Sequence, residues 1–311
     1  MSEVLKVVNK IKEKPYIIDM GAKKIASWLK VSSEAVREAK KILRGEIIEP
    51  FGGPKILFLD IETAPTLAYV YQKQVWKANI KYNQILSEWF ILTFAYSWLG
   101  DDGVFSEKVS PLEAINEDDS RLLLQLWNIL NEADIVVCHG GDYFDIPNIN
   151  TRFVLAGLGP TTYYKQVDTL KIARKQFGFT HNSLGALAKV FGIDAKLETN
   201  FELWKACLDG NEKALGYMAE YNEGDVRILK SIYLKLRPWI KSHPNYGLYT
   251  SKDDVLVCPH CGGRSLEKDG GFYYTQTGKY PTYRCLVCGA KPRDRKSVSD
   301  INNKVVSIPG R

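Results

Sequence analysis

Two carboxylates, Asp60 and Glu62, stand near the end of the apolar stretch 55–63, which lies between Pro54 and Pro65. The run predicts a buried strand, and a spacing of two sends both side chains to the same face of its sheet. Two like charges held together on a buried strand are unfavourable unless a cation binds them, and a hard divalent metal ion is the simplest candidate. The alternative is that Asp60 caps the next turn while Glu62 faces solvent.

Three later segments carry side chains that could complete such a site. Asp145 follows the glycines of a His-Gly-Gly turn and precedes Pro147, which suits the first turn of a helix. The alternative role for Asp145 is the N-cap of that helix. Tyr221 and Asp225 are four residues apart, so they share one face of a predicted helix. Asp168 stands at a strand-to-helix junction, where a helix N-cap is its expected role and a substrate-side acid the alternative.

Four cysteines form two Cys-x-x-Cys pairs, each followed by glycine, with 23 residues between the pairs: Cys258, Cys261, Cys285 and Cys288. Four thiolates in this pattern predict a closed, structural zinc site, with a disulfide pair as the alternative. Around the second pair, aromatic residues stand beside Lys279 and Arg284, a composition that suits nucleic-acid or protein contact. Cys138 and Cys207 are expected to be ordinary buried thiols.

The elements that must position these residues alternate between strand and helix patterns. Strands are expected at 90–98, 104–109 and 134–138, the first two joined as a hairpin through the glycines of 100–103. Helices are expected at 117–130, 183–191, 201–208 and 212–236. This order predicts an α/β fold, a mixed sheet flanked by helices, over residues 54–245.

A small helical module is expected over residues 1–50. An amphipathic helix near 2–13 precedes two more, at 21–30 and 34–44, and the turn between the last two offers serine N-caps. The arrangement resembles a helix-turn-helix whose second helix would present basic residues to nucleic acid, namely Arg37, Lys40, Lys41 and Arg44. A zinc ribbon is expected over 252–292 and a basic, mobile tail over 293–311.

Between the first two strands, aromatic residues alternate with lysines in the segment 69–82. Trp76 and Lys77 stand at its centre, and such a mixture suits stacking on unpaired bases and neutralising phosphates. The alternative is that Trp76 and Tyr82 cover the edge of the sheet. Thr63, directly after the two acids, is a further expected nucleic-acid contact.

The chain of 311 residues has a formal net charge of +6 that is unevenly distributed. Residues 1–53 hold 11 Lys and Arg against 7 Asp and Glu, and residues 252–311 hold 11 against 6, whereas the middle holds 20 against 23. Two basic terminal segments around a slightly acidic central segment suggest that the terminal segments bind a polyanion and that the central segment binds metal. Without an apolar run of about 18 residues or a secretory signal, a cytoplasmic protein is expected (host cytoplasm if viral), with no membrane span.

Three motifs of this chain, in their order, resemble the three motifs of the DEDD (DnaQ-like) exonuclease superfamily on the ribonuclease H fold. They are Asp60-x-Glu62, Phe144-Asp145 and Tyr221-x-x-x-Asp225. The third motif resembles the tyrosine subtype, as in the proofreading domains of family B DNA polymerases. One departure is that Gly140 follows His139, where related second motifs carry asparagine. Asp142 adds a carboxylate that the four-acid scheme does not require.

The resemblance implies a two-metal mechanism with two Mg²⁺ or Mn²⁺ ions. Asp60, Glu62 and Asp225 would hold the ion that activates water, Asp60 and Asp145 would hold the ion on the leaving group, and Tyr221 would orient the water. The implied function is 3′-5′ exonuclease action on single-stranded DNA or RNA. Alternatives are an endonuclease of the same fold on hybrid, branched or structured nucleic acid, and a non-catalytic nucleic-acid-binding protein. Protein partners through the zinc ribbon are possible, and the oligomeric state is open.

Overall fold

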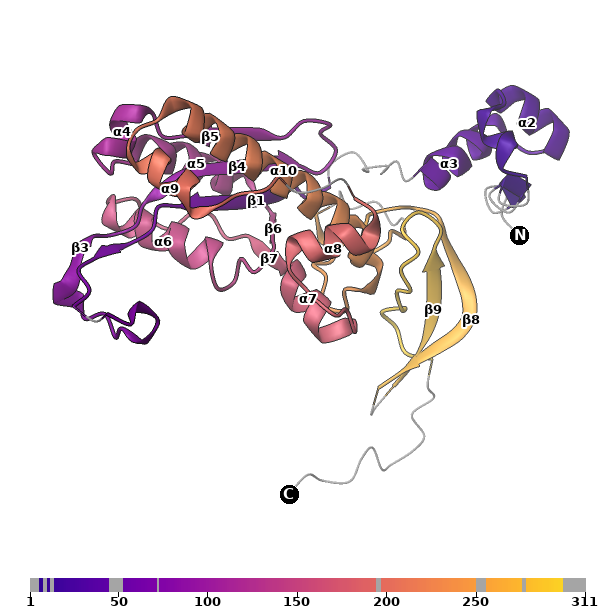
Figure 1. Ribbon diagram of the computed structural model, residues 1–311. Helices are drawn as coiled ribbons and strands as arrows, with labels where there is room; N and C mark the ends of the chain where they lie inside the picture. Colours follow the sequence, from indigo (N-terminus) through magenta and orange to yellow (C-terminus); the bar gives the residue numbers. More distant parts are fainter. Residues whose placement is uncertain are drawn as a thin grey trace, which may run out of the picture. The chain divides into compact units, whose positions relative to one another are not determined.

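The computed structural model describes residues 6–7, 10–11, 14–44, 53–71, 73–193, 197–249, 256–275 and 278–298. The chain divides into two compact units, whose helices and strands are labelled in Figure 1. One unit is Lys55–Leu236, and the other combines Met1–Pro54 with Arg237–Arg311. Within the described residues, no helix is both long and apolar enough to cross a membrane.

A five-stranded mixed sheet forms the centre of the unit Lys55–Leu236. Its strands are β1 (Ile56–Thr63), β4 (Ile91–Trp98), β5 (Phe105–Lys108), β6 (Ile135–Cys138) and β7 (Lys165–Asp168). They lie in the order β5-β4-β1-β6-β7, with β4 antiparallel to both β1 and β5, and with β6 parallel to both β1 and β7. The predicted 100–103 hairpin is therefore confirmed, and β1 is paired on both of its edges.

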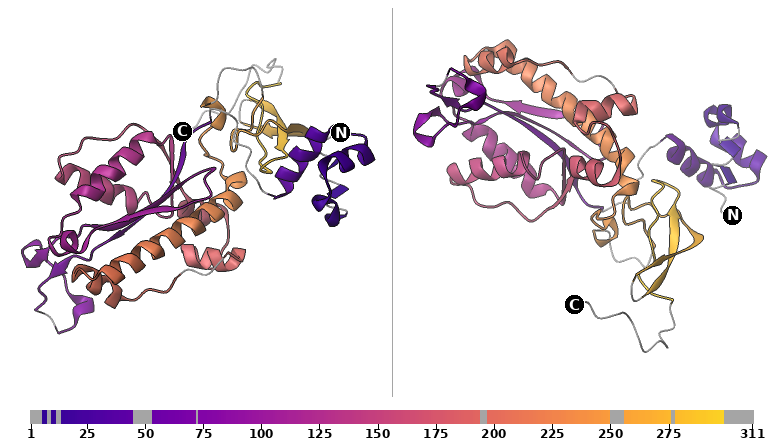
Figure 2. Two further views of the ribbon diagram at one scale, coloured as in Figure 1. Left: turned by 90° about the horizontal axis from the view of Figure 1, so that it is seen from above. Right: turned by 60° about the horizontal axis from the view of Figure 1, so that its bottom comes forward.

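Helices cover both faces of this sheet. They are α4 (Pro111–Ile115), α5 (Ser120–Glu132), α6 (Asp145–Leu155), α7 (Thr169–Gln176), α8 (Leu184–Phe191), α9 (Phe201–Leu208) and α10 (Glu212–Leu236). Figure 2 shows α5 and α6 on one face and the long α10 on the other. The expected α/β fold with a mixed sheet is confirmed, and α9 and α10 have the predicted bounds.

The α4–α5 region differs from the single helix expected at 117–130. A short α4 begins first, because Ser110 accepts a hydrogen bond from the Glu113 N–H and Glu113 bonds back to the Ser110 N–H. Glu117 then takes a left-handed conformation with φ of 55°, and α5 starts only at Ser120. This capping box, which is readable in the sequence, explains the additional helix.

A buried ion pair joins α5 and α6 to the start of β4. The carboxylate of Asp119, with 1% of its surface exposed, accepts hydrogen bonds from Arg152 Nε at 2.8 Å and from a terminal Arg152 nitrogen at 2.7 Å. The same carboxylate accepts the backbone N–H of Ile91 at 2.9 Å. Three elements therefore depend on one buried charge pair.

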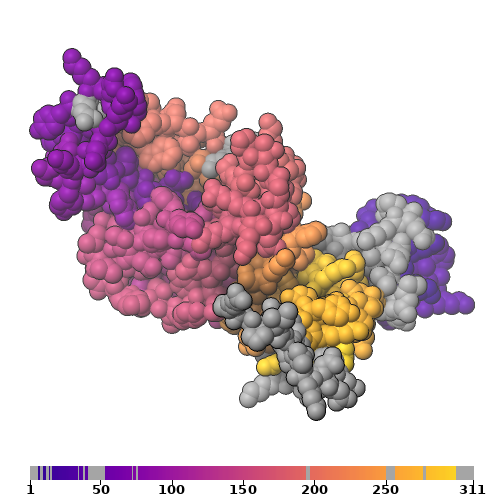
Figure 3. Space-filling model, turned by 90° about the horizontal axis from the view of Figure 1, so that it is seen from below, coloured from indigo at the N-terminus to yellow at the C-terminus, as the bar shows by residue number. Residues whose placement is uncertain are grey.

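Residues 65–89 form an arm between β1 and β4. It contains β2 (Leu67–Ala68), η2 (Val75–Lys77), η3 (Tyr82–Gln84) and β3 (Ile85–Ser87), and β2 and β3 pair as a separate two-stranded sheet. In Figure 3 the arm is the purple projection at the upper left. Trp76 and Tyr82 are 77% and 83% exposed, so the alternative in which they cover the edge of the main sheet is wrong.

The N-terminal module consists of helical residues at 6–7 and 10–11, η1 (Pro15–Asp19), α2 (Ala22–Leu29) and α3 (Ser33–Arg44). The Oγ of Ser32 accepts the N–H of Ala35, as expected of an N-cap. Ile17, Ile25 and Val36 belong to one buried cluster within the module. The remainder of the helix expected at 2–13 lies outside the described residues.

After α10 the chain continues through η4 (Arg237–Trp239) and η5 (Tyr246–Leu248) to a hairpin of β8 (Leu266–Tyr274) and β9 (Lys279–Cys285). Residues 290–298 run beside β9, where Asp294 donates its N–H to Pro281 O and Val298 donates its N–H to Lys279 O. The first part of the tail expected to be mobile is therefore held against the hairpin. Residues 299–311 lie outside the described residues.

Replacing Arg152 by methionine should destabilise the unit Lys55–Leu236 by about 3–5 kcal/mol, because the Asp119 carboxylate would remain buried without its cation. Urea unfolding followed by tryptophan fluorescence measures this change. Glu132→Gln is the matched control: it removes the Lys55–Glu132 pair, whose side chains are both 59% exposed, and should cost less than about 1 kcal/mol. Equal effects of the two variants would contradict the importance of the buried pair.

Candidate metal centre

The two carboxylates of β1 point to the face of the sheet covered by α10. Side chains alternate along β1, so Phe58, Asp60 and Glu62 share one face. On this face the ring of Phe58 contacts Tyr233 of α10, with ring centroids 5.2 Å apart. Asp60 and Glu62 are only partly buried, whereas Leu57, Leu59 and Ile61 on the other face are in the core.

Asp225 of α10 joins these two acids. Carboxylate oxygens of Asp60, Glu62 and Asp225 all lie within 4.8 Å of one another. Asp225 is 3% exposed, so the cluster has a buried side and a side open to solvent. Three hard oxygen donors this close fit a divalent cation such as Mg²⁺ or Mn²⁺, since each additional negative charge raises the cost of an empty cluster.

Asn222 is a member of this site that the sequence analysis missed. Its Nδ2 donates a hydrogen bond of 2.6 Å to Asp60 Oδ2, and its side chain is completely buried. Its Oδ1 has no hydrogen-bond partner within the described part of the chain. The sequence did contain a signal for this role. Asn222 is an amide in the middle of an amphipathic helix, between Tyr221 and Asp225.

Asp145 approaches the same strand from the start of α6. Its Oδ1 accepts the backbone N–H of Ile61, the residue between Asp60 and Glu62, at 3.2 Å. Asp145 is therefore tied to β1 instead of capping α6, whose N-cap residue is Phe144. Burial raises the pKa of Asp145 to about 7, with the negative charge of Asp168 adding to the effect and hydrogen bonds opposing it.

Tyr221 is 7% exposed and lies one helical turn before Asp225 on α10. It belongs to the buried cluster that includes Leu59 and Ile61 of β1. Tyr221 is therefore packed in the core on the same helix that carries Asp225.

The turn after β6 brings Asp145 into position. Gly140 has φ of 86°, a conformation that favours glycine, and a Cβ on Gly141 would come within 2.3 Å of Cys138 Cβ. Asp168 accepts the N–H of Gly140 and also those of Leu170 and Lys171, so its predicted N-cap role is confirmed. Asp142, the additional carboxylate, pairs with Lys171.

The predicted nucleic-acid contacts are distributed over several elements. The backbone carbonyl of Thr63, at the end of β1, accepts the indole N–H of Trp204 on α9. Trp76 and Lys77 are exposed on the arm, and Arg37 is exposed on α3. The side chains of Lys41 and Arg44 lie outside the described residues.

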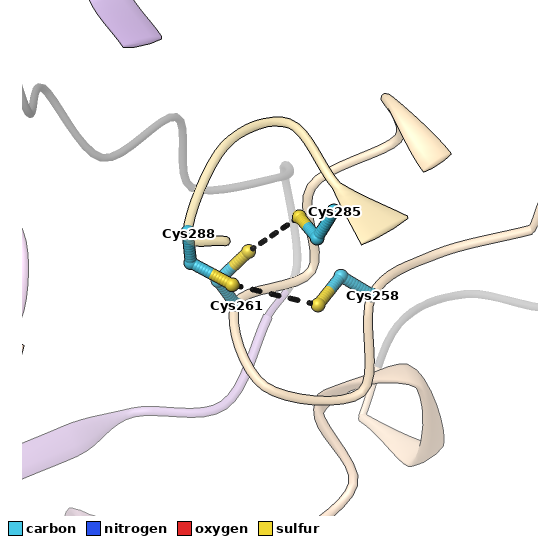
Figure 4. Close-up of side chains that lie close together, drawn as sticks. All are labelled: Cys258, Cys261, Cys285 and Cys288. Carbon is cyan, nitrogen blue, oxygen red and sulfur yellow. Dashed lines mark hydrogen bonds between the residues drawn. The ribbon is translucent and has the colours of Figure 1, made fainter. Parts of the chain in front are cut away.

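Four cysteines gather at the base of the β8–β9 hairpin, as Figure 4 shows. Their Sγ atoms lie within 4.8 Å of one another, and the Cys258–Cys288 and Cys261–Cys285 pairs are each separated by 3.7 Å. None of these cysteines is in a disulfide. Thiolates bound tetrahedrally to zinc at about 2.3 Å would be about 3.8 Å apart, so the donor set fits a zinc ion.

The β8–β9 hairpin places cations over aromatic rings. The Lys279 Nζ lies 3.9 Å from the ring centroid of Phe272, and the Arg293 guanidinium carbon lies 4.2 Å from that of Tyr280. Arg284 is exposed on β9. Cys138 and Cys207, in the other unit, are buried as expected.

Comparisons with known proteins agree with this fold. Residues 87–237 match the model of the RNase_H superfamily, a segment that includes Asp145 and Asp225 and begins after β1. No curated protein matches the chain.

The chain matches 159 chains of solved structures. One is the family B DNA polymerase from the hyperthermophilic archaeon Pyrobaculum calidifontis, with 15% identity and a TM-score of 0.45. The match covers 60% of this chain and 25% of the polymerase, so the chain spans about a quarter of that protein's length. The sheet order and the family match together give an α/β fold of the ribonuclease H type.

The raised pKa of Asp145 predicts a pH-dependent stability in the metal-free protein. Its folded-state pKa of about 7 lies above the ordinary value of about 4 for aspartate. The folded state therefore holds this proton more tightly, and the resulting stability is complete below pH 4 and is lost as the pH rises to 7. The loss should be on the order of 4 kcal/mol, since the pKa differs by about 3 units and each unit corresponds to about 1.4 kcal/mol.

Asp145→Asn is the variant that isolates this effect, because asparagine keeps an oxygen for the Ile61 N–H but does not ionise. Urea unfolding in EDTA at pH 5 and pH 8 should show a smaller decline for the variant than for the wild type. An identical decline in the two proteins would assign the pH dependence to other groups.

Proposed function

We propose that the protein is a metal-dependent nuclease that hydrolyses phosphodiester bonds, acting as a 3′-5′ exonuclease on single-stranded DNA or RNA. The observation that carries the proposal is the approach of three carboxylates, Asp60, Glu62 and Asp225, on a sheet of the ribonuclease H type. The family match over residues 87–237 supports the nuclease assignment. The direction of cleavage and the single-stranded substrate rest on the resemblance of the three motifs.

Four acids would hold two Mg²⁺ or Mn²⁺ ions: Asp60, Glu62 and Asp225 one of them, and Asp60 with Asp145 the other. When bound, such a pair supplies an activated water and stabilises both the attacking and the leaving oxygen. Asn222 holds Asp60 Oδ2 by a 2.6 Å hydrogen bond, which fixes the orientation of the shared carboxylate. Tyr221, fixed by core packing, orients the attacking water.

The flanking modules bind nucleic acid and support the catalytic unit. Cys258, Cys261, Cys285 and Cys288 hold one structural zinc ion, since four thiolates leave no open position for water. Lys279 and Arg284 of the ribbon contact phosphate or a protein partner. On the helix-turn-helix-like module, Arg37, Lys41 and Arg44 contact phosphates, and Thr63 contacts the substrate end near the acids.

Asp60→Asn and Asp225→Asn should each lower metal-dependent hydrolysis of a 5′-labelled single strand by at least about 10³-fold, because each removes a carboxylate charge from the metal site. Tyr221→Phe should lower kcat by about 10–100-fold while leaving Mn²⁺ affinity, measured by calorimetry, within about twofold. Glu220→Gln is the control, since Glu220 neighbours Tyr221 but is exposed.

Full activity in Asp60→Asn or Asp225→Asn would refute the proposed site. The product pattern tests the type of cleavage. Single nucleotides released progressively from the 3′ end agree with an exonuclease, whereas cuts within a circular single strand would assign the site to an endonuclease.

Cys285→Ser should lower bound zinc from about one ion per chain to well below one, because a hydroxyl is a poor zinc ligand compared with a thiolate. Metal content measured by inductively coupled plasma mass spectrometry checks this result. Cys207→Ser, which changes a buried cysteine of the other unit, should retain the ion. Equal zinc content in both variants, or no zinc in the wild type, would contradict the zinc assignment.

A further inference from the structure

The arm, residues 65–89, lacks a core of its own. Among its described side chains none is buried, and four of its aromatic residues are strongly exposed: Tyr69, Tyr71, Trp76 and Tyr82 are 64%, 91%, 77% and 83% exposed. A two-stranded hairpin without a hydrophobic face has only marginal stability in water. The four exposed aromatic rings therefore do not stabilise the fold of the arm, and we ask what else they could contact.

The charge of the arm is mainly positive. Residues 65–89 contain three lysines, Lys73, Lys77 and Lys81, and one acid, Glu88, which lies at the base of the arm next to β4. All three lysines are exposed. The unit around them is slightly acidic in sequence, so the positive charge is concentrated on the part that carries the exposed rings.

A small cavity lies on the arm. Its volume is about 310 Å³, and its lining includes Tyr71, Lys81 and the amide side chains of Asn79, Asn83 and Gln84. This volume is at the lower end of the range of roughly 300–1,000 Å³ for small-ligand sites. A ring face, amide donors and acceptors, and a cation are the groups that bind a base and its phosphate.

The arm begins directly beside the proposed metal centre. β1 carries Glu62, and two residues later the Ala64 N–H donates to Phe90 O, which closes the base of the arm at 2.8 Å. Tyr69 follows Glu62 by seven residues, so the two Cα atoms can be at most about 25 Å apart. A strand of several nucleotides that ends at the acids can reach the arm.

From these observations we infer that the arm is a docking platform for the single-stranded part of the substrate, with bases stacked on its rings and phosphates paired with its lysines. Base faces are available for stacking in unpaired strands and are covered in a duplex, which favours a single strand. The inference rests on the proposed nuclease function for its choice of ligand. It adds a substrate-binding surface outside the metal centre.

The test uses the full-length protein in three forms besides the wild type. The ring variant carries Tyr71→Ala, Trp76→Ala and Tyr82→Ala, and the charge variant carries Lys73→Gln, Lys77→Gln and Lys81→Gln. The control variant carries Tyr163→Ala and Lys165→Gln. Tyr163 is also exposed, but it precedes β7 at the opposite end of the parallel strands from Glu62.

Binding is measured first, by fluorescence anisotropy of a labelled 20-nucleotide oligothymidylate in Ca²⁺ at several salt concentrations. The ring variant should raise Kd about tenfold or more, because stacking on one aromatic residue contributes roughly 1–3 kcal/mol per base. The charge variant should flatten the slope of log K against log salt by about 2, or about 0.7 per lysine. The control should match the wild type in both quantities.

Hydrolysis is measured second, on thymidine 5′-p-nitrophenyl phosphate with Mn²⁺, a substrate too small to reach the arm. Both arm variants should hydrolyse it at wild-type rates while losing efficiency on the 20-mer. A parallel loss on the small ester would mean that the arm shapes the metal centre, which overturns the docking role. Wild-type Kd and salt slope in the arm variants would also overturn it and assign the exposed rings to a protein partner.

The two proposals fail in different ways. If the wild type binds the strand through the arm but hydrolyses neither substrate, the nuclease function fails and the platform stands. If it hydrolyses both while the arm variants bind normally, the platform fails and the nuclease function stands.

Discussion

Repulsion between carboxylates is the constraint on which this structure depends. Oxygens of Asp60, Glu62 and Asp225 lie within 4.8 Å of one another, and two unit charges at about 4 Å repel by about 4 kcal/mol at an effective dielectric constant of 20. Such a cluster persists only where the surrounding fold holds the side chains in place and a cation can compensate the charge. The surrounding fold must therefore hold two elements together against this repulsion, β1 with Asp60 and Glu62 and α10 with Asp225.

The fold holds the acids by placing them on its two most constrained elements. β1 pairs with β4 on one edge and with β6 on the other, so its backbone cannot shift without breaking two ladders. α10 packs its buried face across the same sheet, and the contact of Phe58 with Tyr233 fixes its register beside the acids. The hydrogen bond from Asn222 to the Asp60 side chain then connects α10 with β1, and the bond from the Ile61 backbone N–H to Asp145 connects β1 with α6.

The sequence predicts those features of the structure that are determined by residues close to one another along the chain. The alternation of β1, the bounds of α9 and α10, the Asp168 N-cap and the approach of the four cysteines all follow from short-range spacing. The Asp119–Arg152 pair and the Asn222–Asp60 bond do not, because residues 33 and 162 positions apart meet only after the sheet has formed. The exposure of the arm could not be predicted either. The same aromatic residue types occur in a segment that covers the edge of a sheet and in one that projects into solvent.

The departure at Gly140 illustrates how backbone geometry limits side-chain chemistry at the site. Position 140 has φ of 86°, its N–H binds Asp168, and a Cβ there would lie 3.3 Å from Leu170. A side-chain amide at this position would strain the turn that delivers Asp145 to β1. A side-chain amide does contact an acid of the cluster from another element: Asn222 of α10, one turn before Asp225, donates a hydrogen bond to Asp60. α10 also carries Tyr221 and Asp225. The residue that orients Asp60, Asn222, therefore lies on the same rigid helix as two groups that are expected to act together with Asp60.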